Sequence, residues 1–557
     1  LKSELNLTGP LFETAVDANG QLTSLPADAA LAVSIHHGVG GSRLRVGFRT
    51  SEFDAETATR LAAYHLRALE LLVGDPTASP RTQSLLSQEE VDYQVTALAG
   101  PSRELPDLRV HELFEQRVDA HPDAIAGRHL GEQWTYRELN ERANQVARTL
   151  LDSGVERETV VAVVTERNLG WMAAVVGIFK AGAVYLPIEP HFPPVRIEKT
   201  LARADCEVIL TEAGSTATLD EALEALPEAR KLLLTDAFEH EDVSNLGLDV
   251  ELDQLAYIYF TSGSTGEPKG AMCEHAGMVN HMYAKIEDLG VREGEVVTQI
   301  APQCFDISLW QLVAPLLVGG CTLIVDQETI LQPERFVDLI VDSDVGVVQV
   351  VPSYLEVLLT YLDHHPRELG SLHAVSVTGE ALTLELAQRW FGSQSGIALI
   401  NAYGLTETSD DTNHEVMTEP PVGSVPLGPA VRNVTIYIVD EHLSPVPLGA
   451  PGEITFSGMC VGRGYINDPE RTAQAYLDDP LRPGERLYRS GDFGRWRPDG
   501  KLEYLGRRDA QVKIRGFRIE IGEIENTLVQ LDGIRQGAVV ITGSDDTNKQ
   551  LVAFYSG

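Results

Sequence analysis

The chain of 557 residues carries 44 Lys and Arg against 82 Asp and Glu, which leaves a formal net charge of −38. This sign is wrong for a protein that wraps nucleic acid or rests on an anionic membrane, so we expect neither partner. With 43% apolar and 23% charged residues, the composition indicates a large buried core and excludes a disordered or collagen-like chain. The length predicts three or four compact units.

The cysteines and the ends of the chain bear on where the protein works. Five cysteines lie far apart without a CxxC pair, which argues against a disulfide framework or a zinc site and favours a reducing cytoplasm. No apolar run approaches the ~18 residues that cross a bilayer, and the first residues lack the apolar core of a signal peptide. Because the chain begins at Leu1 and stops at Gly557 within a predicted strand, we expect a piece of a longer protein.

The first residues read as a small unit followed by a linker. Alternation over 44–48 predicts a hairpin, and apolar residues from Leu61 to Val73 recur at helical spacing. A unit of this length, residues 1–75, is too small to be stable by itself. Residues 76–107 are rich in Pro, Ser and Gly and predict a linker packed along a neighbour.

From residue 108 the pattern changes to buried strands that alternate with helices. A strand at 160–164, a helix at 171–181 and a strand at 184–187 are typical of a parallel sheet with crossover helices, which is an α/β fold. Thr135 and Glu138 form a capping box at the start of a helix that Gly154 ends. Further strands are predicted at 256–260, 345–350, 374–377 and 399–402. After residue 506 we expect a basic hairpin, a helix near 523–531 and strands at 538–542 and 551–555.

The strongest local signal is YFTSGSTGEPKG at 259–270, directly after an apolar strand. Backbone amides, hydroxyls and Lys269 in such a turn can surround phosphate oxygens. The segment is not a Walker A loop, because Pro268 and Gly270 stand where that motif needs Gly and Ser or Thr. The alternative is a flexible polar turn.

This loop resembles the phosphate loop of the adenylate-forming superfamily, specifically that of amino-acid adenylation domains of nonribosomal peptide synthetases. Other segments similar to that family follow the same order: WTYREL at 134–139, KAGAVYLPIE at 180–189, FDIS at 305–308, NAYGLTE at 401–407, GEI at 452–454 with GRGY at 462–465, YRSGD at 488–492 and GRRDAQVKIRG at 506–516. Glu189 stands where the family more usually has Asp. The resemblance implies a large adenylation core of parallel sheets and helices over 108–505, a truncated small α+β C-terminal subdomain over 506–557, and a condensation-domain remnant over 1–75.

The resemblance also implies an activity. An amino acid carboxylate attacks the α-phosphorus of ATP, forms aminoacyl-AMP and releases pyrophosphate, and the product is loaded onto the phosphopantetheine of a separate carrier domain. Glu407 is the expected Mg²⁺ ligand, because a hard cation prefers oxygen. Tyr403 would stack on adenine, Asp492 would hold the ribose, and Arg507 would reach ribose or phosphate. The residues expected at the phosphates are Thr261, Ser262, Gly263, Ser264, Thr265, Gly266, Lys269 and Thr406. A turn aspartate and a solvated loop acid are the alternatives for Asp492 and Glu407.

By the same resemblance, Asp306 pairs with the substrate's α-ammonium group, although an aspartate here could also cap a helix over 307–317. The other expected pocket residues are Ile307, Trp310, Gln349, Ser376, Thr378, Ala402, Asp410 and Asp411. Two acids at one end of a pocket are costly unless a cation or donors satisfy them. This favours a substrate whose side chain is cationic or makes several hydrogen bonds. A substrate with a hydroxylated or amide side chain remains an alternative. A second alternative is that one of the two acids faces solvent.

Asp509 is the expected hinge between core and small subdomain, and a solvated charged hairpin is the alternative. The family's catalytic lysine belongs to an Asn-Gly-Lys motif that would follow Gly557, so we expect slow adenylate formation by this chain; Lys549 lacks that context. Expected partners are a downstream carrier protein, an upstream condensation domain and an MbtH-like protein near residues 450–452. Two alternatives remain: an acyl-CoA or aryl-acid ligase, which Asp306 disfavours, and a catalytically idle docking fragment.

Overall fold

The computed structural model describes residues 14–17, 20–21, 24–25, 29–39, 41–79, 83–262, 267–507, 511–514, 517–529, 531, 533–543 and 550–557. They form two compact units, one of Leu1–Tyr93 with Ser444–Pro447 and one of Gln94–Leu443 with Leu448–Gly557. The break after Tyr93 falls within 76–107, where the sequence predicts a linker. None of the helices in the described part of the chain has the length and apolar composition of a membrane span.

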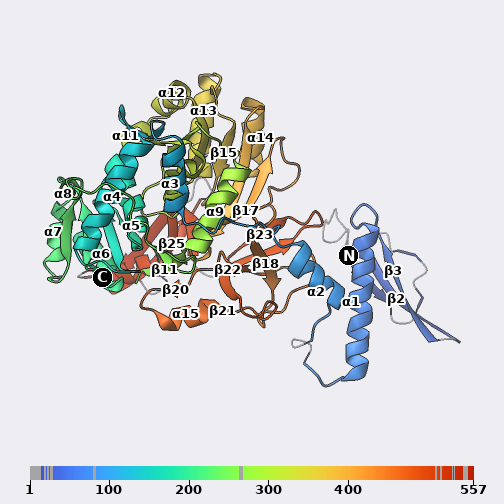
Figure 1. Ribbon diagram of the computed structural model, residues 1–557. Helices are drawn as coiled ribbons and strands as arrows, with labels where there is room; N and C mark the ends of the chain where they lie inside the picture. Colours follow the sequence, from blue (N-terminus) through green and yellow to red (C-terminus); the bar gives the residue numbers. More distant parts are fainter. Residues whose placement is uncertain are drawn as a thin grey trace. The chain divides into compact units, whose positions relative to one another are not determined.

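The smaller unit is built on a three-stranded sheet (Figure 1). β2 (Leu31–Gly38) and β3 (Gly41–Phe48) form the predicted antiparallel hairpin, and α1 (Ala55–Gly74) is the predicted helix. The side chain of Asp54 caps α1 by accepting a hydrogen bond from Thr57 N at 2.7 Å. The sequence did not predict β1 (Thr14–Asp17), which pairs with β2 in parallel. α2 (Gln88–Asp92) leads into a π-helical turn, η2 (Tyr93–Ala97).

The larger unit contains a seven-stranded sheet in the order β20-β11-β10-β7-β6-β8-β9. Its parallel strands β6 and β7 are apolar throughout and almost entirely buried, as strands covered on both faces must be. The capping box at Thr135 is confirmed, with Glu138 bonding back to Thr135 N at 2.8 Å. The strands are β6 (Val160–Val164), β7 (Val184–Ile188), β8 (Val208–Thr211), β9 (Arg230–Leu233), β10 (Leu255–Thr261), β11 (Lys269–Glu274) and β20 (Gly464–Tyr465), and the helices α4 (Tyr136–Asp152), α5 (Leu169–Lys180), α6 (Pro194–Arg203), α7 (Ala217–Leu223) and α8 (Leu234–Ala237).

An eight-stranded sheet follows, in the order β17-β16-β15-β14-β12-β13-β4-β5. The helix predicted over 307–317 begins at Ile307 but tightens into a 3₁₀ turn from Ala314, where Pro315 offers no backbone N–H. The strands are β4 (Ile125–His129), β5 (Glu132–Thr135), β12 (Val296–Gln299), β13 (Cys321–Ile324), β14 (Val345–Val350), β15 (Ala374–Val377), β16 (Ala398–Leu405) and β17 (Asp410–Met417). The helices are α3 (Val110–Ala120), α9 (His275–Asp288), α10 (Ile307–Val313), η3 (Ala314–Val318), α11 (Gln327–Ile330), α12 (Pro333–Asp342), α13 (Pro352–His364) and α14 (Leu384–Ser393).

A smaller antiparallel sheet and the C-terminal elements complete the larger unit. The sheet has the order β18-β19-β22-β21, with β23 also paired to β22. Its parts are β18 (Val434–Val439), β19 (Gly452–Gly458), α15 (Pro469–Ala475), β21 (Tyr476–Asp478), β22 (Arg486–Trp496) and β23 (Leu502–Arg507). The predicted hairpin, helix and two strands are present as β24 (Gln511–Ile514), β25 (Phe517–Glu520), α16 (Ile521–Val529), β26 (Gln536–Thr542) and β27 (Gln550–Ser556).

The topology gathers the carboxyl ends of several strands in one region. β14, β15 and β16 are neighbouring parallel strands, and β10 of the other sheet leads into the phosphate-loop sequence. In α/β sheets, ligands bind beyond the carboxyl ends of such strands. The predicted α/β fold with two parallel-stranded sheets is therefore confirmed, and it places most of the expected site residues at strand ends.

Candidate functional site

A cavity of about 620 Å³ opens at these strand ends. The predicted site residues that line it are Thr261, Ser262, Asp306, Ile307, Gln349, Thr378, Thr406, Asp410 and Asp411. Phe517 and Glu523, from β25 and α16, also border the cavity, and the Phe517 ring lies edge-on to Phe305 with 5.1 Å between ring centroids. Residues that are far apart in sequence thus surround one space.

Three other predicted pocket residues are buried among the atoms behind this wall. Trp310 is fully buried, and its indole N–H donates to the Gln349 side-chain oxygen. Ser376 and Ala402 are buried on β15 and β16. These three residues therefore do not line the cavity themselves, whereas Gln349, the hydrogen-bond partner of Trp310, does.

A lysine, an acid and a tyrosine form a contacting group beside the phosphate-loop sequence. Glu407 has no exposed surface, so the alternative of a solvated loop acid is wrong. Tyr465 donates its hydroxyl to Glu407 Oε1 at 2.8 Å, and Lys269 Nζ lies 3.4 Å from the same oxygen. Gly263, Ser264, Thr265 and Gly266 lie outside the described residues. The sequence missed Tyr465 as a partner of Glu407, although it ends the GRGY segment.

The residues expected at adenine and ribose contact one another. Tyr403 donates its hydroxyl to Asp492 Oδ2 at 2.5 Å, and Arg507 Nη1 donates to Asp492 Oδ1 at 2.6 Å. Asp492 is 2% exposed and lies inside β22, so the alternative of a turn aspartate is wrong. Both carboxylate oxygens have internal partners here, and a ribose hydroxyl would have to exchange with one of these hydrogen bonds.

Asp306 lies at the start of α10, as its expected capping role requires. Its carboxylate accepts a hydrogen bond from Ile307 N at 2.9 Å. Burial raises the pKa of Asp306 to about 6; the Thr406 hydroxyl opposes this shift, and the negative charge of Asp411 adds to it. The carboxyl lines the cavity, so it can cap the helix and face a ligand at once.

The two adjacent acids, Asp410 and Asp411, both reach the cavity because the strand is irregular. In a regular strand, neighbouring side chains point to opposite faces. The pairing of β16 with β17 shifts register between Tyr403 and Gly404, and Asp410 has a left-handed backbone with φ 82°. Asp410 is 5% exposed and Asp411 3% exposed, so the alternative that one of them faces solvent is wrong.

Gly404 is required for this irregular pairing. A Cβ atom there would lie 2.0 Å from Asp410 O and 2.4 Å from Asp411 Cα. Gly404→Ala is therefore expected to force β17 away from β16 and to cost about 1–3 kcal/mol in the free energy of unfolding, measured by urea denaturation. Gly396→Ala is the matched control, since a Cβ there meets no atom within 4 Å. Equal stability of the two variants would contradict this expectation.

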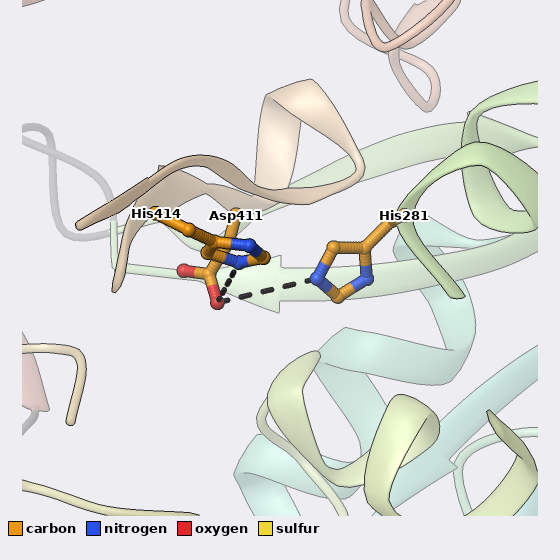
Figure 2. A group of neighbouring side chains, drawn as sticks. All are labelled: His281, Asp411 and His414. Carbon is orange, nitrogen blue, oxygen red and sulfur yellow. Dashed lines mark ion pairs between the residues drawn. The ribbon is translucent and has the colours of Figure 1, made fainter. Parts of the chain in front are cut away.

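Behind the two acids lies a buried group of basic side chains that the sequence did not single out. Figure 2 shows His281 from α9 and His414 from β17, whose Nε2 atoms lie 4.0 and 3.9 Å from Asp411 Oδ2. Lys285, one turn after His281, places Nζ 2.6 Å from the same oxygen. His281 and Lys285 share the helical spacing i, i+4, which was the one local signal available.

The pKa directions follow from this arrangement. Burial alone would raise the pKa of Asp411, but Lys285 and the His414 ring lower it well below its ordinary value. Burial, Asp306 and Asp411 together raise the pKa of Asp410. Burial and the neighbouring Lys285 lower the pKa of His281, so this ring is neutral. The acid pair is therefore unequal, with Asp411 neutralised from behind and Asp410 not.

Comparisons with known proteins identify the family of the chain. A family model described as AMP-binding enzyme matches residues 114–466. The chain is 33% identical to tyrocidine synthase 3 of Brevibacillus parabrevis over 98% of its own length. It is similar to the nonribosomal peptide synthetase FmoA3 bound to α-methyl-L-serine-AMP, with a TM-score of 0.76, 26% identity, and coverage of 89% of this chain and 57% of that one.

A second solved structure, an adenylation and PCP protein bound to a vinylsulfonamide inhibitor, has a TM-score of 0.72 and 26% identity over 81% of this chain and 76% of that one. The chain spans only 8% of tyrocidine synthase 3, and 20% of bacitracin synthase 2 of Bacillus licheniformis, to which it is 32% identical over 94% of its own length. The chain belongs to the AMP-binding enzyme family and is an adenylate-forming ligase domain of the nonribosomal peptide synthetase type.

Proposed function

We propose that this domain activates an amino acid as aminoacyl-AMP for transfer to a carrier protein. The observation that carries the proposal is the single cavity that holds Asp306 together with Thr261, Ser262 and Thr406. Asp306 can bind an α-ammonium group, while the hydroxyls can bind phosphate oxygens. The amino acid carboxylate is thereby held beside the α-phosphorus, which it attacks as pyrophosphate leaves.

Bringing two anions together requires positive charge at the reacting end. Lys269 supplies one such charge, and it lies beside Glu407. Glu407 offers the oxygen ligand that Mg²⁺ takes from a protein carboxylate, but it has no exposed surface and contacts Lys269 and Tyr465, so one of these contacts would have to open for the ion to bind. The bound ion would neutralise charge that develops on the phosphates. The chain's own residues position the nucleotide: Asp492 and Arg507 at the ribose, and Tyr403 at the adenine.

The partners follow from the same assignment. The phosphopantetheine of a carrier domain would accept the aminoacyl group, and a condensation domain would precede this one in the longer protein, with an MbtH-like protein as a further partner near 450–452. Asp509 as the hinge lies outside the described residues. The cytoplasmic location and each of these partners are predictions.

The proposal is tested by ATP–pyrophosphate exchange with a panel of amino acids, fatty acids and aryl acids. We expect at least one amino acid to stimulate exchange, and no acid without an α-ammonium group to do so. Stimulation by a fatty or aryl acid alone would favour an acyl-CoA or aryl-acid ligase. Binding of aminoacyl sulfamoyl adenosines, stable mimics of aminoacyl-AMP, gives a second readout that does not depend on turnover.

Asp306 gives this binding a distinctive pH dependence. Its raised pKa of about 6 means that the carboxyl is protonated in acid and cannot pair with an ammonium group. For an analogue with a neutral side chain, the Kd should be constant above about pH 7 and rise up to tenfold per unit below pH 6. Asp306→Asn should bind about 30-fold or more weakly at pH 8, with this pH dependence gone. A Kd that is flat from pH 5 to 8 in the unsubstituted protein would contradict the role.

A further inference from the structure

We propose that Lys285 sets the class of amino acid that this site accepts. By pairing with Asp411 it leaves Asp410 as the one acid of the Asp410–Asp411 pair without a counter-ion, so the site selects an amino acid whose side chain carries a single basic group. The inference rests on the proposed function and deepens it, because it names the substrate class of the same cavity.

The position of Lys285 is fixed by its surroundings. The side chain has no exposed surface, its Nζ lies 2.6 Å from Asp411 Oδ2, and it lies 5.0 Å from the centroid of the Trp310 ring. Trp310 is itself held by its hydrogen bond to Gln349. An ammonium group in such a place cannot turn outward to water, and it therefore acts as a permanent counter-ion for Asp411.

The three side chains in Figure 2 could otherwise be read as a metal site. Their ligand atoms lie within 4.8 Å of one another, and Asp288 Oδ2 is 2.7 Å from His414 Nδ1, as an outer carboxylate in a metal site would be. However, the shared oxygen, Asp411 Oδ2, already contacts Lys285 Nζ. A divalent cation would have to displace a buried ammonium group, so the resident cation here is Lys285.

Asp410 has no comparable counter-ion. Within the described part of the chain, its ion-pair contact is with His281 Nδ1 at 3.7 Å, and that ring is neutral. Its Oδ2 atom is buried without a hydrogen-bond partner, although the residue lines the cavity. A buried acid in this state is costly unless a ligand satisfies it. The geometry points to a basic group of the substrate as that partner.

The charges of the three acids and the lysine give the substrate class. Asp306 takes the α-ammonium group under the proposed function, and Lys285 takes Asp411. Asp410 remains for the side chain: burial and the neighbouring acids raise its pKa, and a positive charge brought by the ligand would lower that pKa again and leave an ionised pair. A diamino acid or a guanidino amino acid supplies one positive charge, whereas an acidic side chain would meet a like charge. A neutral side chain would leave Asp410 unpaired.

The test compares two isosteric analogues on the full chain: ornithyl and norleucyl sulfamoyl adenosine, which differ by an ammonium group in place of a methyl group. Lysyl, diaminobutyryl and arginyl analogues cover other lengths. At pH 8 we expect at least one basic analogue to bind about 30-fold or more tightly than norleucyl. If the norleucyl analogue, or a glutamyl one, binds as tightly as every basic analogue, the proposal is wrong.

Two variants assign the preference to its residues. Asp410→Asn should bring the basic and norleucyl affinities within about threefold of each other. Lys285→Met frees a second acid and should raise the preference for the basic analogue by about tenfold, whereas Lys285→Arg should keep it. A merely structural role would weaken both analogues equally and leave their ratio unchanged, which would overturn the proposal. If Lys285→Met does not fold, Asp410→Asn decides: a preference that survives it overturns the proposal.

The same binding measurements distinguish failure of the proposed activity from failure of the proposed substrate class. If no aminoacyl analogue binds better than sulfamoyl adenosine itself, the amino acid activation is wrong and the substrate class falls with it. If the norleucyl or a polar neutral analogue binds best, the activation stands and only the substrate class is wrong.

Discussion

Replacing Glu407 with glutamine is expected to lower kcat/KM for ATP–pyrophosphate exchange by about 100- to 1,000-fold. Glu407 has no exposed surface and accepts the Tyr465 hydroxyl at 2.8 Å beside Lys269. An amide of the same shape keeps that hydrogen bond but brings no negative charge to a cation. The loss should appear in a Mg²⁺ titration of the exchange rate as a higher Mg²⁺ requirement.

Glu415→Gln provides the matched control for this experiment. Glu415 is also a largely buried glutamate in an ion pair, but its partner is Lys501, whose Nζ lies 2.6 Å away, and not Lys269 of the phosphate-loop sequence. Its exchange activity should stay within about threefold of the unsubstituted protein. If the two variants lose activity equally, the effect of Glu407 comes from a general loss of packing and not from the ATP site.

The elements of the fold could be predicted from the sequence because their signals are local. The valine run at Val160–Val164 is buried on β6, and the Thr135 capping box starts α4 at the expected residue. Each of these depends on residues close together in the chain. β1 escaped prediction because its parallel pairing with β2 depends on contacts between distant residues.

The site residues could be predicted only where they stand in a recognisable sequence motif. Asp306 and Glu407 could be singled out because they stand in ordered segments; Asp306 lines the cavity, and Glu407 is buried beside Lys269. The conformation of the acid pair could not be found, because strand periodicity places Asp410 and Asp411 on opposite faces. The register shift beside Gly404, which no sequence pattern reveals, lets both acids line the cavity. Lys285 was missed for a related reason, since it comes from α9 and contacts β17 only in the fold.

The contact between Lys285 and Asp411 also changes what the two acids require of a ligand. From the sequence, two acids at one end of the pocket favoured a ligand whose side chain is cationic or makes several hydrogen bonds, unless one acid faced solvent. In the structure Lys285 is the counter-ion of Asp411, with Nζ 2.6 Å from Oδ2, so the preference for a cationic side chain now depends on Asp410 alone. Burial still makes an unpaired acid costly, but the ligand has to supply fewer charges to satisfy it.

The pair between Lys285 and Asp411 is expected to dominate the stability of this region. Lys285→Met leaves a buried carboxylate without its counter-ion, and Asp411→Asn leaves a buried ammonium group, so each should lower the free energy of unfolding by about 3–5 kcal/mol. The double variant removes both charges and should recover most of that loss. The measurement is a double-mutant cycle on the urea transition of the larger unit.

Arg335 and Glu328 supply the control cycle, because they form an ion pair at 2.6 Å with side chains that are 55% and 72% exposed. Their coupling energy should be about 0–1 kcal/mol, since water screens an exposed pair. The Lys285–Asp411 coupling must be several times larger if the lysine is a permanent counter-ion. Single variants that lose less than about 1 kcal/mol would mean that water reaches Asp411, and Lys285 would then no longer distinguish it from Asp410.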